Sequence, residues 1–142
     1  MNVLVDTCVI SELQRRVPNK RVVEAIERLL DHEIYFSAIT IGEITKGIAL
    51  LDPGQQQFRL QGWLHGIEQD YAHQILPVDR EVARLWGETS ARLRRIGVGV
   101  PLTDGLIAAT AACHALPLMT RNVRHFGNMN VEVIDPWADG IA

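Results

Sequence analysis

Val3-Leu4-Val5-Asp6-Thr7 stands almost at the start of the chain and sets an acidic residue directly behind a short apolar run rich in β-branched residues. Such runs favour strands, and an acid at the end of one is suited to cap a helix, because its side chain accepts hydrogen bonds from the first backbone N–H groups. The stretch therefore predicts a buried strand that ends at Asp6, followed by a helix from about residue 8 to residue 14.

The rest of the chain alternates short apolar runs with apolar residues at helical spacing. The short runs predict strands at residues 33–36, 75–78, 118–120 and 131–134. The helical spacing predicts helices at residues 22–30, 41–51, 57–71, 82–96 and 106–116, with a glycine-rich loop at 97–101. This alternation is typical of a parallel sheet. We therefore expect one α/β domain over residues 1–142, with a short, mostly parallel sheet covered by helices on both faces.

Composition and charge exclude several classes of protein. The 142 residues are 47% hydrophobic and 22% charged, which allows a packed core and excludes a disordered chain. Apolar runs fall far short of the ~20 residues that span a bilayer, and no basic segment precedes the first run, so we expect a cytoplasmic protein with no membrane contact. The net charge of −3 argues against binding nucleic acid by bulk charge.

Cys8 and Cys113 are expected to be free, partly buried thiols.

Acidic residues end the predicted strands or lie early in the helices behind them. Asp6 ends the first strand, Glu43 follows the second, and Asp104 opens the buried helix after the glycine-rich loop. Taken singly, Asp6 and Asp104 are also explained as helix caps, and Glu43 as a surface partner of Lys46. Ligands bind beyond the carboxyl ends of parallel strands, where gathered carboxylates need a cation to offset their repulsion. Such oxygens suit Mg²⁺ or Mn²⁺ and favour a phosphodiesterase.

Spacing alone does not establish that the three acids converge, but four sequence blocks point to a known family. In order they are VLVDTCVISEL (3–13), SAITIGEI (37–44), DGLIAATA (104–111) and TRNVRHF (120–126). Each block is short, and their shared order makes the match specific; the similarity extends from residue 1 to about residue 137. The chain resembles the PIN-domain ribonucleases, and within them the VapC-like toxins of type II toxin–antitoxin pairs, including the FitB-like branch.

The resemblance implies a PIN-like fold with an acidic pocket that binds Mg²⁺, with Mn²⁺ as an alternative, and that cleaves single-stranded RNA. By position, Asp6 and Asp104 match the family's principal metal ligands, and Glu43 matches its third catalytic acid. Four further residues match or flank positions that line the pocket: Thr7, Thr120, Asn122 and His125. The resemblance also implies a cognate antitoxin that holds the enzyme inactive, and a homodimer of the toxin.

One position departs from the family's pattern. Many relatives carry an acid three residues after the asparagine, where this chain has His125. A histidine supplies no anionic oxygen, so a second metal position is expected to be weak, absent or biased toward a softer ion such as Mn²⁺. The competing interpretation makes His125 a surface residue on a variable loop. Gly105 stands where many relatives have alanine, which should weaken the start of the helix only slightly.

Basic residues near the four blocks are candidates for RNA phosphate contacts, although ordinary solvated charges explain them as well. They are Arg15, Arg16, Lys20, Lys46, Arg121 and Arg124. Trp63 and Trp86 fall on apolar helical stripes and are expected to pack in the core rather than stack on bases. The sequence thus predicts a Mg²⁺-dependent endoribonuclease toxin. The alternative is a catalytically weak PIN-like module that mainly binds RNA or its antitoxin.

Overall fold

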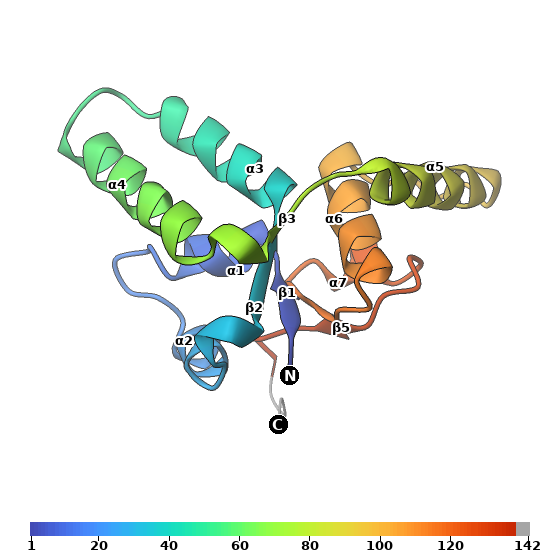
Figure 1. The fold of residues 1–142 in the computed structure, drawn as a ribbon, viewed down its shortest axis with the longest axis horizontal. Helices are drawn as coiled ribbons and strands as arrows, with labels where there is room; N and C mark the ends of the chain where they lie inside the picture. The colour runs from blue at the N-terminus through green and yellow to red at the C-terminus, as the bar shows by residue number, and fades with distance from the viewer. Residues whose placement is uncertain (139–142) are drawn as a thin grey trace.

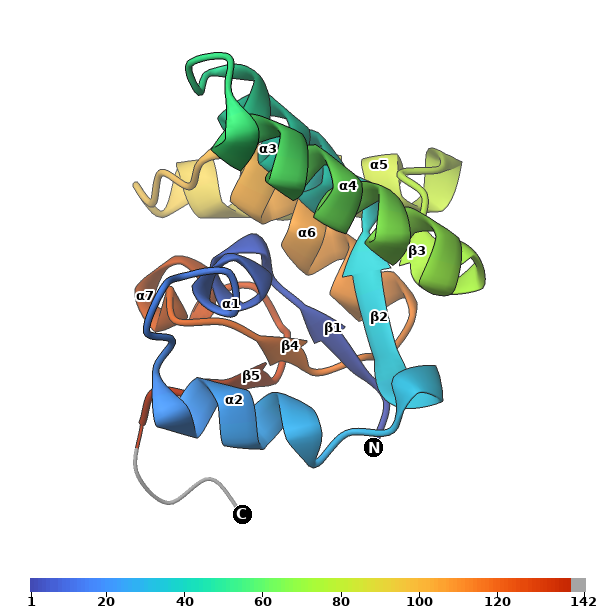
Figure 2. The ribbon, with the colours of Figure 1, turned by 90° about the vertical axis from the view of Figure 1, so that its left-hand side faces the viewer.

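A computed structural model describes residues 1–138, and within them a five-stranded sheet forms the centre of the molecule (Figure 1). The strands are β1 (Val3–Val5), β2 (Ile34–Ser37), β3 (Ile75–Leu76), β4 (Leu118–Met119) and β5 (Val133–Ile134). They lie in the order β3-β2-β1-β4-β5, and every neighbouring pair is parallel. Figure 2 shows β1 between β2 and β4. The prediction of a parallel α/β sheet is confirmed, with the first strand of the chain at its centre.

Seven α-helices within the described residues surround this sheet, and two 3₁₀ turns, Asp31–Glu33 and Ala72–Gln74, precede β2 and β3. The α-helices are α1 (Thr7–Glu12), α2 (Lys20–Glu27), α3 (Ala38–Ala49), α4 (Gln55–Asp70), α5 (Arg80–Arg95), α6 (Leu102–Cys113) and α7 (Val123–Phe126). In Figure 1, α3 with α4 and α5 with α6 form two arms that diverge above the strands. Among these helices none has the length and apolar character that a bilayer crossing needs.

The side chains of β1 alternate between two apolar cores, one on each face of the sheet. Val3 and Val5 belong to the first core, together with residues of α1, α2, α3 and α4. Leu4 belongs to the second core, together with residues of α5, α6 and α7. All three side chains are fully buried, which is why the strand is a continuous apolar run rather than an alternating one. The predicted cover of helices on both faces is confirmed.

Two strands pass directly into helices at the carboxyl edge of the sheet. Asp6 follows β1 and is the N-cap of α1, where its side chain accepts a hydrogen bond from the backbone N–H of Thr7. Ser37 ends β2 and is the N-cap of α3, where its hydroxyl accepts a hydrogen bond from the backbone N–H of Ile39. The starts of α1 and α3 therefore lie side by side, and α1 and α3 pack against each other.

The structure differs from the sequence-based expectations in several places. The segment at residues 121–130 contains the short helix α7, whose four residues are too few to show a helical period. Strands β3, β4 and β5 are each two residues long, shorter than predicted. Cys113 is exposed rather than partly buried, and both cysteines are free. Tertiary packing decides where a helix or strand ends and whether a very short one forms. The hydrophobic period of the sequence does not reveal this packing.

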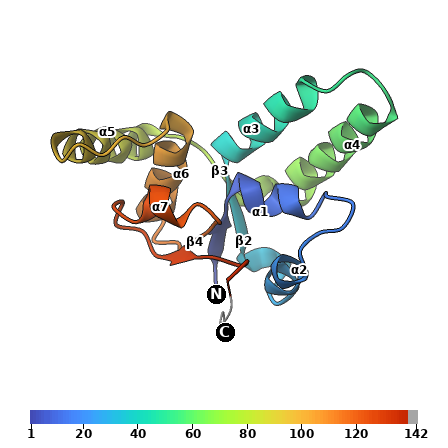
Figure 3. The same cartoon turned by 180° about the vertical axis from the view of Figure 1, so that it is seen from behind.

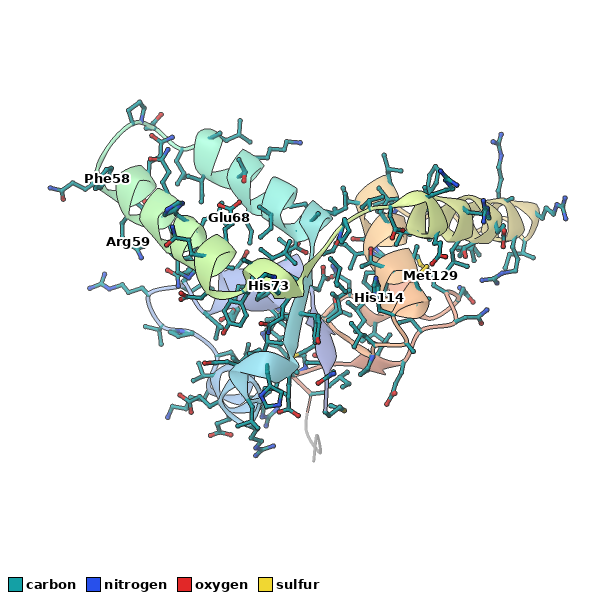
Figure 4. The ribbon with its side chains drawn as sticks, in the orientation of Figure 1. Phe58, Arg59, Glu68, His73, His114 and Met129 are labelled. Atoms are coloured by element: carbon teal, nitrogen blue, oxygen red, sulfur yellow. The ribbon has the colours of Figure 1, made fainter. Side chains whose placement is uncertain are left out.

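The two tryptophans differ in their surroundings. Trp63 packs against the first core, as predicted. Trp86 is half-buried and lines a cavity of about 220 Å³ beside α5 and α6, which Met129 also lines (Figure 4). A Cβ atom at Gly105 would come within 3.0 Å of the Trp86 indole. The glycine therefore allows α6 and the Trp86 ring to approach closely.

We expect Gly105→Ala to stabilise the protein less than Gly62→Ala. Both glycines lie inside helices, where alanine is favoured by about 0.5–1 kcal/mol. A Cβ at Gly62 meets nothing within 4 Å, whereas one at Gly105 forces the Trp86 ring to shift. Urea unfolding of the two variants measures the difference in free energy of unfolding. Equal stabilisation would contradict the close packing of Gly105 on Trp86.

Candidate active site

Asp6 is a buried carboxylate held by donors from two strand ends. Its side chain is 3% exposed. The backbone N–H of Thr7 donates to Oδ1 at 2.8 Å, and the Thr120 hydroxyl donates to Oδ2 at 2.7 Å. The Cys8 thiol also donates to Oδ2, at 3.5 Å. Since β1 and β4 are neighbours, the fold brings Thr120 to Asp6 across 114 residues of sequence.

Burial is the largest influence on the Asp6 carboxyl and raises its pKa above the ordinary value. The negative charge of Asp104 makes a further, smaller contribution that also raises this pKa. The hydrogen bonds from Thr120, Thr7 and Cys8 lower the pKa by stabilising the charged form. A cation beside both carboxylates would offset the burial and the repulsion together.

Glu43 is connected to Asp6 through Thr7. The Thr7 hydroxyl donates to Glu43 Oε1 at 2.6 Å and lies 3.1 Å from the hydroxyl of Thr40. The same residue donates its backbone N–H to Asp6. Glu43 is therefore half-buried and fixed toward α1, which gives it a role beyond that of a surface partner of Lys46.

Asp104 lies in the first turn of α6 but does not cap that helix, because the N-cap position is Pro101. The interpretation of Asp104 as a helix cap is therefore wrong. Its Oδ2 lies 2.5 Å from Nδ1 of His125 in α7. Figure 3 shows α6 directly above α7, on the side of the sheet opposite α1. His125 is thus on a short helix rather than a loop, and its imidazole contacts a site carboxylate. Its side chain is exposed, as the interpretation of a surface residue expects.

Asn122 lies at the edge of this group. Its backbone N–H donates to the Thr120 hydroxyl oxygen at 3.1 Å, which links the start of α7 to the Asp6 network. The Asn122 residue is exposed. A role for its amide in holding water or ligand stays a prediction.

The four main candidates for phosphate contacts are all exposed: Arg15, Lys46, Arg121 and Arg124. Two of them have partners within the protein. Arg15 lies 3.4 Å from the Glu12 carboxylate, and the Arg121 guanidinium lies 5.0 Å from the ring centre of Trp137. Arg124 is on α7, the helix that carries His125. Their contacts with RNA stay predictions.

Two residues of the network were missed as site residues by the sequence analysis. Thr40 is fully buried and contacts Thr7, and Cys8 contacts both Asp6 and Thr120. Burial and the charge of Asp6 raise the pKa of the Cys8 thiol to about 11, so it acts as a donor and not as a thiolate. Both lie inside the matched sequence blocks, and small polar residues within apolar runs were the available signal.

The chemistry of these donors fits a hard divalent cation. Asp6, Asp104 and Glu43 offer carboxylate oxygens, and Cys8 keeps its proton and so offers no thiolate to zinc. Within residues 1–138 no three His, Cys, Asp or Glu side chains lie close enough to hold a metal ion as a group. Mg²⁺ commonly binds through one or two carboxylates and keeps several waters. Under that mode of binding, Asp6 and Asp104 would be the two carboxylate ligands.

The fold and this acidic edge match a known class of domain. The family model described as PIN domain matches residues 3–130, which is most of the chain. The chain therefore belongs to the PIN-domain family, as the four sequence blocks predicted.

Particular relatives refine this assignment. The chain is 38% identical to Toxin FitB of Neisseria gonorrhoeae, over 96% of this chain and 99% of that protein. It is 32% identical to VapC ribonuclease Y4jK of Sinorhizobium fredii, over 95% and 97%. The solved structure of FitAB bound to the IR36 DNA fragment matches with a TM-score of 0.92 at 36% identity, over 98% of each chain. DNA-bound VapBC of Salmonella typhimurium shares the fold, with a TM-score of 0.79 at 22% identity over 96% and 98%.

We expect Thr120→Val to lower the free energy of unfolding by about 1–3 kcal/mol, because it removes a hydroxyl donor from a buried carboxylate. Thr110→Val is the matched control. Thr110 is equally buried, but its hydroxyl donates to the Leu106 carbonyl inside α6, which a helical backbone N–H also contacts. The control should lose less than the Thr120 variant in chemical denaturation. Similar losses in the two variants would show that Thr120 does not support Asp6.

Proposed function

We propose that this protein is a metal-dependent endoribonuclease that hydrolyses RNA phosphodiester bonds and acts as the toxin of a toxin–antitoxin pair. The observation that carries the proposal is the PIN-domain match over residues 3–130, in which Asp6 is a buried carboxylate held by Thr7 and Thr120 at the carboxyl end of the central strand. Glu43 is connected to Asp6 through Thr7. The names of the relatives, Toxin FitB and VapC ribonuclease Y4jK, support the same reaction and role.

In this proposal Asp6 and Asp104 hold the cation, which is Mg²⁺ or Mn²⁺, through their carboxylate oxygens. When bound, such an ion lowers the pKa of a water molecule and neutralises charge on the scissile phosphate. Thr120 and Thr7 donate to the two oxygens of Asp6 and so set the orientation of its carboxylate. The Thr7 hydroxyl holds Glu43 toward the site, where it adds the third negative charge.

The partners in this proposal are a single-stranded RNA substrate, a cognate antitoxin and a second copy of the chain. Exposed basic residues at the margin of the acidic site would contact RNA phosphates, since the site itself repels a polyanion. The matched solved structures include FitAB and VapBC, each bound to DNA. By analogy we propose an antitoxin partner that blocks the site, and a homodimer as the form of the toxin in the cytoplasm.

One observation favours the second candidate function, a catalytically weak module that binds RNA or its antitoxin. The imidazole of His125 already contacts Asp104 Oδ2, an oxygen that the enzyme hypothesis assigns to the cation. If this contact persists in the presence of metal, Asp104 is not available as a ligand. RNA retention without product formation in Mg²⁺ and in Mn²⁺ would distinguish this module from the enzyme.

Asp6→Asn and Asp104→Asn should each abolish metal-dependent RNA cleavage while the far-UV circular dichroism stays native, because asparagine keeps the size of the side chain but removes its charge. The expected fall in the cleavage rate is at least ~10²-fold. Glu68→Gln, which removes an exposed carboxylate from α4 (Figure 4), is the control and should keep full activity. Chelation of the metal by EDTA should stop RNA cleavage by the native protein, and added Mg²⁺ or Mn²⁺ should restore the cleavage. Cleavage that survives in either Asp variant, or in EDTA, would refute the proposed site.

Arg124→Ala should weaken RNA binding without slowing the chemical step. The residue is exposed on α7 next to His125, so we expect KM to rise several-fold with kcat nearly unchanged. The slope of log affinity against log salt concentration should fall by about 0.7, the value for one phosphate contact on a single strand. Arg84→Ala, on the exposed face of α5, is the control. If the slope of log affinity against log salt concentration is unchanged in the Arg124 variant, Arg124 does not contact an RNA phosphate.

A further inference from the structure

The contact between His125 and Asp104 joins two packed helices. Asp104 Oδ2 and His125 Nδ1 are 2.5 Å apart. Phe126, the neighbour of His125, is fully buried in the second core, and Ile107 of α6 is buried in the same core. The backbones that carry the two side chains are therefore fixed relative to each other, although His125 itself is half-exposed. An ion bound at Asp104 Oδ2 would therefore lie beside the His125 imidazole.

Nitrogen and oxygen donors differ in the metals that they prefer. Mg²⁺ takes oxygen ligands and water, whereas imidazole nitrogen suits the transition metals. Within residues 1–138 no three His, Cys, Asp or Glu side chains form a group that could hold a metal ion, so an ion at Asp104 would complete its coordination with water. A site with one imidazole among carboxylates and water is a mixed nitrogen–oxygen site.

We propose that His125 is a nitrogen ligand of the cation held at Asp104, and that it makes this protein select Mn²⁺ over Mg²⁺. The proposal rests on the proposed function in placing a cation at Asp104. For Nδ1 to bind the ion, the ring takes the tautomer with its proton on Nε2. The direct contact between Nδ1 and Oδ2 is then replaced by one bond from each atom to the ion. The half-exposed ring exchanges that proton with solvent.

The test measures binding of each metal alone to the full chain, by calorimetry, in the native protein and three variants. The native protein should bind Mn²⁺ at least ~tenfold more tightly than Mg²⁺. His125→Ala should lose about tenfold or more in Mn²⁺ affinity and change little toward Mg²⁺. His125→Asp replaces the imidazole nitrogen by a carboxylate oxygen. This variant should bind Mg²⁺ more tightly than the native protein and lose the preference for Mn²⁺ over Mg²⁺. His65→Ala, on the exposed surface of α4, is the control and should match the native protein.

Pulsed electron paramagnetic resonance gives a second readout that is independent of activity. Bound Mn²⁺ should show modulation from a directly coordinated ¹⁴N nucleus in the native protein and in His65→Ala, and none in His125→Ala. Bound Mn²⁺ without that modulation would overturn the proposal. So would a His125→Ala variant that binds the ions as tightly as before, or more tightly, because the imidazole would then be a competitor for Asp104. Failure of the native protein to bind either ion, with RNA cleavage persisting in EDTA, would overturn the proposed function as well.

Discussion

The burial of one carboxylate, that of Asp6, is the constraint on which the site depends. The central strand of the sheet leads directly into this residue, which is 3% exposed. Three donors satisfy it, from Thr7, Cys8 and Thr120, yet burial and the charge of Asp104 still raise its pKa. A buried anion near a second anion is stable only with compensating charge, by loss of its own charge or by a bound cation. In the proposed function a bound cation supplies this compensating charge.

The topology explains why residues so distant in sequence meet there. Parallel strands have their carboxyl ends at one edge of the sheet, and β1 lies between β2 and β4. Asp6 follows β1, Thr120 follows β4, and α3 carries Glu43 directly behind β2. α6 then brings Asp104, and α7 brings His125 against it. Asp6, Thr120 and Asp104 come from strand ends or the first turn of a helix, and Glu43 lies in the second turn of α3.

Local patterns in the sequence were sufficient to predict most of the fold. The apolar run at Val3–Val5 and the helical spacing at residues 82–96 predict elements that the structure contains nearly as expected. Helix α7 was missed because four residues show no period, and the Asp104 cap was wrong because Pro101 starts α6 one turn earlier. The acids were identified through family resemblance, since spacing does not report convergence. The contact of His125 with Asp104 depends on the packing of α6 against α7 and has no local signal.

The central claim is that Asp6 and Asp104 together hold a divalent cation. Anomalous diffraction from crystals of the full chain soaked in Mn²⁺ tests it most directly, because the signal locates the ion without reference to activity. We expect one strong peak at about 2.2 Å from a carboxylate oxygen of each residue. A map with ordered Asp6 and Asp104 side chains and no peak between them, at Mn²⁺ concentrations that support RNA cleavage, would contradict the account.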